Sequence, residues 1–187
     1  MTGTQTTTRT TTWTIDPAHS VIEFAVKHMM FTTAKGRFQD FDGTITLDEQ
    51  TMENSRVDVT ITTASIDTQT EDRDNHLRSA DFFDVETYPE ATFRSTRIEP
   101  QRGNEFVLYG DLTIKGQTSE VRLDASFLGT GTNPWGQEVA GFEAKGTFKR
   151  KDFGLTWNQA LEGGGVLVSD EVKLSLDIQA VKANAEG

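Results

Sequence analysis

The sequence has no cysteine and far fewer basic than acidic residues. Without cysteine the chain has no disulfide framework, no thiolate metal ligand and no cysteine nucleophile. Eighteen lysines and arginines against 29 aspartates and glutamates give a formal net charge of −11. Because this charge repels phosphate backbones, nucleic acid is not expected as a partner. An anionic membrane surface is disfavoured for the same reason.

Long apolar runs are also missing. No run approaches the length of a membrane span, so we expect no integral membrane segment. Residues 1–12 are almost all threonine and lack the apolar stretch of a secretory signal. We therefore expect a disordered threonine-rich arm over residues 1–12, a single folded domain over residues 13–182, and a cytoplasmic location.

The residue patterns that carry enzyme chemistry are sparse. The only imidazoles are His19, His28 and His76, and no two of them have the spacing of a helical zinc motif. The glycine triplet 163–165 is followed by Val166, not by the Lys-Ser/Thr of a phosphate-binding loop. No serine lies in a Gly-x-Ser-x-Gly context. We expect no bound metal and no cofactor.

Alternation of apolar and polar residues dominates the chain and predicts an all-β fold. About eight predicted strands follow one another, most of them at hairpin-length intervals, which is typical of an antiparallel barrel or sandwich. The phase of alternation slips between Phe38 and Phe41, which indicates a bulge near Gln39-Asp40. Because bulges and glycines within strands help a sheet to curve, we predict a closed eight-stranded barrel, with a sandwich as the alternative.

One stretch, residues 68–95, departs from the β pattern. Thr68 and Glu71 have the spacing of a capping box, which predicts the start of a helix. The helical insertion is expected to run from about Gln69 to Asp84. It ends in two adjacent phenylalanines, Phe82 and Phe83, which need an apolar surface. We expect the insertion to act as a flap or plug over the β-structure.

The predicted barrel interior is rich in aromatic residues. The chain has twelve phenylalanines, and many fall at alternating strand positions. A filled core is the simplest interpretation. However, an eight-stranded barrel lies near the limit between a packed interior and one that holds a ligand. An apolar interior with few polar groups suits an apolar ligand with one polar end. The residues expected to line a cavity are Phe24, Val26, Phe38, Val59, Ile61, Phe83, Phe93, Leu108, Phe142, Phe148 and Leu174.

The polar end of such a ligand needs hydrogen-bond partners once it leaves water. His28 lies in phase with Phe24 and Val26, so we expect it to point inward. Asn75 and Arg78 lie on the helical insertion. We predict that His28, together with Asn75 or Arg78, contacts the polar head of the ligand. The alternative is a histidine that only braces the core through a hydrogen bond to a neighbour, or one that lies at the strand end near solvent.

Several motifs recur in an order that is typical of one family. They are Asp16-Pro17-Ala18-His19-Ser20, Phe24 with His28, Gly36-x-Phe38, Phe41-x-Gly43, the run Asn75 to Asp84 with Tyr88-Pro89, Phe153-Gly154, Trp157-Asn158, and Glu162 to Val172. Over about Trp13 to Val181 the chain resembles the YceI-like family.

The resemblance implies an antiparallel, lipocalin-like barrel that binds a long isoprenoid without a covalent bond. A polyprenyl lipid or an isoprenoid quinone is the implied ligand, and relatives suggest a homodimer. We therefore predict a non-enzymatic protein that binds, stores or transports such a lipid. The alternative is an enzyme that acts on an isoprenoid or another small apolar substrate through His19 or His28.

Overall fold

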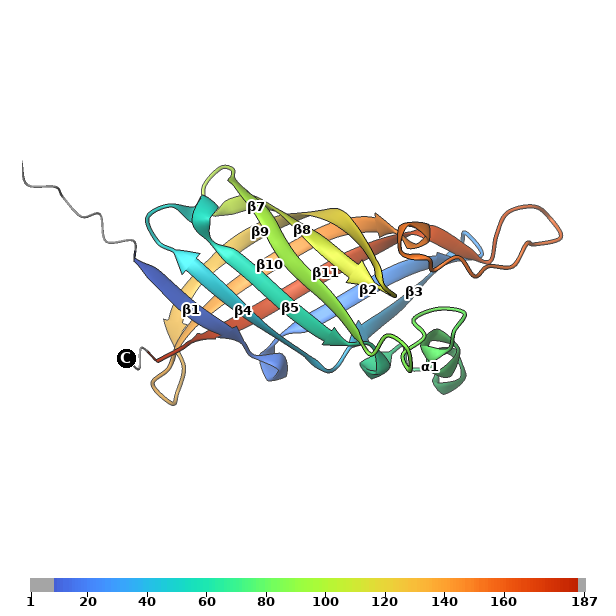
Figure 1. Ribbon diagram of the computed structural model, residues 1–187, viewed down its shortest axis with the longest axis horizontal. Helices are drawn as coiled ribbons and strands as arrows, with labels where there is room; N and C mark the ends of the chain where they lie inside the picture. The colour runs from blue at the N-terminus through green and yellow to red at the C-terminus, as the bar shows by residue number, and fades with distance from the viewer. Residues whose placement is uncertain (1–8, 185–187) are drawn as a thin grey trace, which may run out of the picture.

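The computed structural model describes residues 9–184 and shows a β-barrel with one short α-helix (Figure 1). The strands are β1 (Thr10–Ile15), β2 (Val21–His28), β3 (Thr32–Phe38), β4 (Phe41–Asp48), β5 (Arg56–Thr62), β6 (Ile66–Asp67), β7 (Glu90–Pro100), β8 (Glu105–Ile114), β9 (Gln117–Thr132), β10 (Glu138–Lys149) and β11 (Val168–Lys182). The helix α1 (Glu71–Arg78) lies between β6 and β7. In the described part of the chain, no helix has the length and hydropathy needed to cross a membrane.

The barrel closes through eight strands. Hydrogen-bonded neighbours follow the order β1-β4-β5-β7-β8-β9-β10-β11, and β11 pairs with β1 to complete the ring. All pairs are antiparallel. The remaining three strands lengthen this wall. Strand β2 pairs with β11 beyond the end of β1, β3 pairs with β2, and β6 pairs with β3. The predicted eight-stranded antiparallel barrel is confirmed.

The breaks in the wall strands have local causes. Between β1 and β2, Pro17 has no N–H to donate, and the Asp16 carboxylate accepts a hydrogen bond from the Ala18 N–H to cap a 3₁₀ turn. Between β3 and β4 we expected a bulge near Gln39-Asp40. The phase slip is present, but it is a break of two residues, whose N–H groups bond to the Ser65 carbonyl and hydroxyl.

The helical insertion is shorter than predicted. The helix begins at Glu71 with Thr70 as the N-cap, so the expected capping box at Thr68 is wrong. The Thr68 N–H and hydroxyl instead donate to the buried carboxylate of Asp74, which ties α1 to the end of β6. The helix ends at Arg78, and the following residues to position 87 form turns rather than helix.

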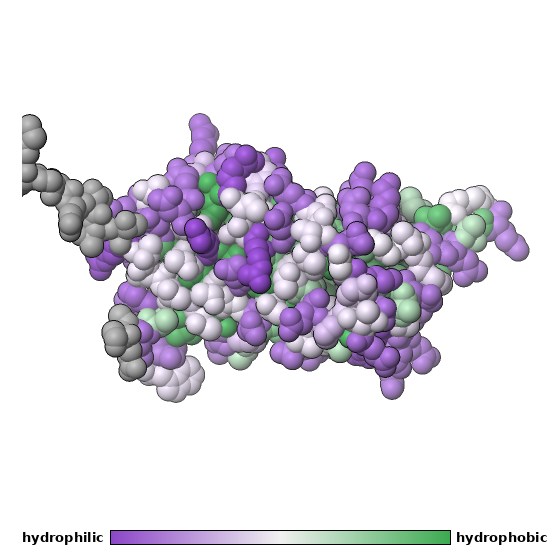
Figure 2. Space-filling model, viewed as in Figure 1, coloured by the Kyte–Doolittle hydropathy of each residue, from purple (hydrophilic) through white to green (hydrophobic). Residues whose placement is uncertain are grey.

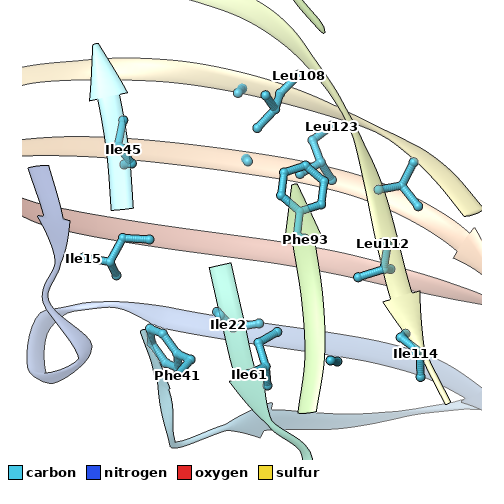
Figure 3. Packing of buried hydrophobic residues seen from close by; sticks show 14 of the residues in the cluster. Ile15, Ile22, Phe41, Ile45, Ile61, Phe93, Leu108, Leu112, Ile114 and Leu123 are labelled. Atoms are coloured by element: carbon cyan, nitrogen blue, oxygen red, sulfur yellow. The ribbon is translucent and has the colours of Figure 1, made fainter. Parts of the chain in front are cut away.

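The inner wall carries one continuous apolar cluster. Phe93, Leu108, Leu112 and Leu123 belong to it and point toward one another from β7, β8 and β9 (Figure 3). Strand β1 begins at Thr10, three residues before the boundary expected at position 13. The first eight residues of the expected arm lie outside the described residues.

Candidate ligand-binding cavity

The barrel interior is not filled by its side chains. It holds a cavity of about 670 Å³, within the range of about 300–1,000 Å³ that is typical of small-molecule sites. The lining extends from Trp13 and Asp48 at one end of the barrel to His28 and Trp157 at the end that carries α1. Most of the lining is aliphatic or aromatic, because the inward positions of the alternating strands are apolar.

The structure places most of the predicted site residues on this cavity. The lining includes Phe24, Val26, His28, Phe38, Val59, Ile61, Phe83, Phe93, Leu108, Phe142, Phe148 and Leu174. Asn75 and Arg78 are not among the lining residues. Whether any of these residues contacts a ligand stays a prediction.

Small residues help to shape the wall. Ala125 on β9 and Ala144 on β10 lie opposite each other in register, and both line the cavity. At Gly110 on β8, a side chain would overlap the ring of Phe93 and the backbone of the neighbouring strand. The glycine therefore leaves room for the Phe93 ring to approach the backbone of β8 closely.

Arg78 joins the helix to the barrel wall and Asn75 bonds to Arg78, whereas neither residue lines the cavity. The Arg78 guanidinium donates to the carbonyl oxygens of Ala64, at 2.9 Å, and Ile66, at 3.0 Å. It also donates to the side-chain oxygen of Asn75, at 3.1 Å. These bonds hold α1 against the connection between β5 and β6.

An aromatic cluster that sequence reasoning missed lies at the α1 end of the cavity. The His76 ring on α1 packs edge-on against Phe82, at 5.1 Å between centroids, and against Trp157, at 4.7 Å. The His76 Nε2 lies 2.9 Å from an oxygen of Asp81, which fixes the ring in place. All three rings line the cavity. The adjacent Phe82-Phe83 pair was the one sequence signal for this contact.

The three histidines occupy different environments. His76 is half-buried in the aromatic cluster, whereas His28 lines the cavity mouth but is exposed at the end of β2. His19 is not a lining residue; its Nδ1 lies 2.8 Å from Asp16, and that contact holds the pKa of the Asp16 carboxyl below its ordinary value. His19 precedes β2 and His28 is the last residue of that strand, so the length of β2 separates them and the two do not form a joint site.

A buried arginine organises the segment that carries Trp157. The Arg150 guanidinium donates to the carbonyl oxygens of Ser169 and Leu155, both at 2.9 Å, and of Trp157, at 3.2 Å. Burial lowers the pKa of Arg150, and the nearby charge of Asp170 opposes that change. The Arg150 side chain bonds to carbonyl groups that precede and follow residues 158–168. It therefore holds both ends of this segment at the end of the cavity.

The opposite end of the cavity is closed by the turn after β4. The Asp48 carboxylate accepts hydrogen bonds from the N–H groups of Thr51, at 2.9 Å, and Gln50, at 3.0 Å. Together with the Asn54 amide, these bonds hold the pKa of Asp48 below its ordinary value. Met52 on this turn lines the cavity. The two ends therefore differ, because an acidic turn lies at one end, whereas α1 and the segment that carries Trp157 border the mouth at the other.

Comparison with known proteins identifies the family. A family model described as the YceI-like domain matches residues 13–180. The chain belongs to the YceI-like family. Protein YceI of Salmonella newport is 41% identical over 164 residues, which covers 88% of this chain and 82% of the relative. The resemblance seen in the sequence motifs is confirmed.

Solved structures of other proteins share the barrel. The crystal structure of BcnA from Burkholderia cenocepacia superposes with a TM-score of 0.77 and 27% sequence identity, covering 88% of this chain and 98% of that one. A polyisoprenoid binding domain from Saccharophagus degradans, 14% identical, superposes with a TM-score of 0.63 and shows the same fold. That comparison covers 91% of this chain and 98% of the other.

Proposed function

We propose that the protein binds one long isoprenoid lipid, of the polyprenyl or isoprenoid quinone type, and stores or carries it without changing it chemically. The observation that carries this proposal is the apolar cavity of about 670 Å³, whose lining extends from one end of the barrel to the other. A long, thin, apolar ligand matches such a space. The polyisoprenoid binding domain from Saccharophagus degradans supports this choice, since it has the same fold.

The tail of the ligand supplies the affinity. Each buried CH₂ contributes about 0.8 kcal/mol, so one isoprene unit of five carbons contributes about 4 kcal/mol before the cost of ordering the chain. The apolar wall offers few directional contacts, and the tail therefore gains affinity through its length more than through specific bonds.

We place the polar head of the ligand at the α1 end. His28 lines this end, as do the polar side chains of Thr68 and Arg73. The structure gives no support for the predicted help from Asn75 or Arg78, because neither residue lines the cavity and Arg78 already donates to two backbone carbonyls. The cytoplasmic location and the homodimer expected from the sequence stay predictions.

Mass spectrometry of an organic extract of the purified protein tests the proposal. We expect an isoprenoid lipid at about one molecule per chain. The Phe142→Trp variant, which narrows the cavity, is the matched control and should carry less lipid or a shorter one. A lipid-free wild-type extract, together with turnover of a prenyl substrate that is lost in His28→Ala or His19→Ala, would instead favour the enzyme.

A further inference from the structure

The turn between β2 and β3 exposes three consecutive large apolar residues at the α1 end of the barrel. Met30 is 65% exposed and Phe31 is 83% exposed, with Met29 beside them. The Met29 N–H donates to the Leu167 carbonyl at 2.8 Å, which brings the exposed Val166 close to the turn. We call Met29, Met30, Phe31 and Val166 the apolar tip.

The apolar tip lies on a projecting part of the molecule. Residues 154–167, which precede β11, extend beyond the barrel at the right of Figure 1. Figure 2 shows hydrophobic side chains on the surface of that projection, set among polar ones. Exposed apolar groups gathered at one extremity are typical of a contact surface.

The backbone of the turn is unfavourable for the residues it carries. Met29 and Met30 have φ angles of 52° and 64°, in the left-handed region that two-residue hairpin turns normally fill with Asn or Gly. The turn is closed by a bond of 3.1 Å from the Phe31 N–H to the His28 carbonyl. Methionines held in this conformation and turned toward water indicate a role other than folding.

The apolar tip adjoins the mouth of the cavity. Lys27 and His28 immediately precede the turn, Leu167 and Val168 immediately follow Val166, and all four line the cavity. A surface that covers the apolar tip would therefore lie against the mouth of the cavity.

Local charge identifies the kind of surface. Residues 27–35, KHMMFTTAK, contain Lys27 and Lys35 and no acidic residue, although the whole chain carries a net charge of −11. Lys27 donates to the Thr33 hydroxyl at 2.9 Å, and Lys35 lies 4.0 Å from Glu23. Both lysines remain exposed. Apolar side chains flanked by lysines match the interface of a bilayer with anionic phospholipids.

We propose that the apolar tip docks on a phospholipid bilayer, with Met30 and Phe31 inserted at the head-group level and Lys27 and Lys35 facing lipid phosphates. Docking presents the cavity mouth to the membrane. The lysines lie beside the apolar tip, the acidic residues nearest to it in the chain are Glu23, Glu162 and Asp170, and screening weakens the repulsion from the more distant acidic residues. Docking itself does not depend on the proposed cargo.

Flotation with isoprenoid-free vesicles of phosphatidylcholine and phosphatidylglycerol tests the proposal. We expect the wild type to float with the vesicles. The double variant Met30→Ser/Phe31→Ser should lose partitioning by about a hundredfold, since each buried side chain is worth about tenfold or more. Trp135→Ser is the matched control, because Trp135 is 77% exposed but lies in the hairpin between β9 and β10 at the opposite end. It should float like the wild type.

Charge and folding provide two further comparisons. Lys27→Gln/Lys35→Gln should weaken flotation with phosphatidylglycerol vesicles more than with vesicles of phosphatidylcholine alone. All of these side chains are exposed, so every variant should keep the melting temperature of the wild type to within a few degrees.

Three results would overturn the proposal: no flotation of the wild type, undiminished flotation of the double variant, or an equal loss in Trp135→Ser. A dimer that Phe31→Ser dissociates, with no flotation, would assign the apolar tip to a contact between two chains. In each of these cases an isoprenoid in the extract would still support the proposed function, so the two failures are distinguishable.

Discussion

Filling the cavity with a protein side chain should separate a ligand site from a packed core. Ala144 on β10 is buried, lines the cavity and faces Ala125 across the pair. The substitution Ala144→Phe adds one phenyl ring to this space. If the ring enters the cavity, its burial contributes about 1.5–3 kcal/mol. If the site is already packed, the added volume costs about 1–3 kcal/mol. We expect the lipid-free variant to unfold at the same or a higher temperature than the wild type.

The same ring should weaken binding of the isoprenoid. It occupies the space of roughly one isoprene unit, whose five carbons contribute about 4 kcal/mol at about 0.8 kcal/mol each. A loss of this size corresponds to a dissociation constant about a thousandfold higher. Titration of the lipid-free protein with a prenyl lipid, followed by tryptophan fluorescence, measures it.

Ala140→Phe is the matched control for this substitution. Ala140 lies on the same strand and in the same phase as Ala144, and it is fully buried, but it does not line the cavity. Its replacement should destabilise the fold through overpacking, by at least about 1–3 kcal/mol. Equal destabilisation by Ala144→Phe and Ala140→Phe would refute the assignment of the cavity.

Three other substitutions test the two ends of the cavity. Arg150→Met should lower the free energy of unfolding, measured in urea, by about 2–4 kcal/mol, because it leaves backbone carbonyls without a donor. The control is Arg122→Met, at an exposed position. Equal destabilisation by the two variants would contradict the role of Arg150 in holding this segment. The pKa of Asp48 is lowered in the folded protein, so its ionised carboxylate stabilises the native state at any pH above the ordinary pKa of aspartate. This stabilisation is lost as the pH falls through the lower pKa that Asp48 has in the folded protein. Asp48→Asn should therefore flatten the acid side of a plot of melting temperature against pH, and an unchanged slope would count against this. His28→Phe should keep its affinity for the tail but lose the preference for polar-headed prenyl lipids over prenyl hydrocarbons; lower stability with an unchanged preference would show that His28 only braces the fold.

The sequence predicts the barrel and its lining well because alternation assigns side chains to faces. Side chains along a strand alternate between its two faces, so once one residue is known to point inward, every second residue along the strand points inward as well. Phe142 and Phe148 on β10, and Phe24 and Val26 on β2, were assigned in this way. Phe24, Phe142 and Phe148 line the cavity from alternating positions, and Val26 joins them at the mouth. The phase slip after Phe38 likewise located the break between β3 and β4.

The helical insertion resists prediction because its sequence has no apolar face. The helix reads EDRDNHLR, with Leu77 as its one apolar residue. Amphipathic periodicity therefore does not show which side meets the barrel. Asn75 and Arg78 were assigned to the ligand, whereas His76 and Leu77 are the residues of this helix that line the cavity along with Arg73. Trp157 lies in an aperiodic segment, where no pattern assigns a direction.

The construction of the wall explains why the helix and the apolar tip lie at the same end. In the described chain β6 pairs with β3 but not with β7, so the ladder is incomplete on that side of the barrel. Side-chain bonds from Arg78 and Asp74 hold α1 beside this gap. Side-chain contacts of this kind open at a lower free energy than a continuous ladder of backbone bonds. This gap in the ladder lies at the end that also carries the apolar tip and His28, so a lipid that moved between a docked bilayer and the cavity by the route proposed above would pass beside it.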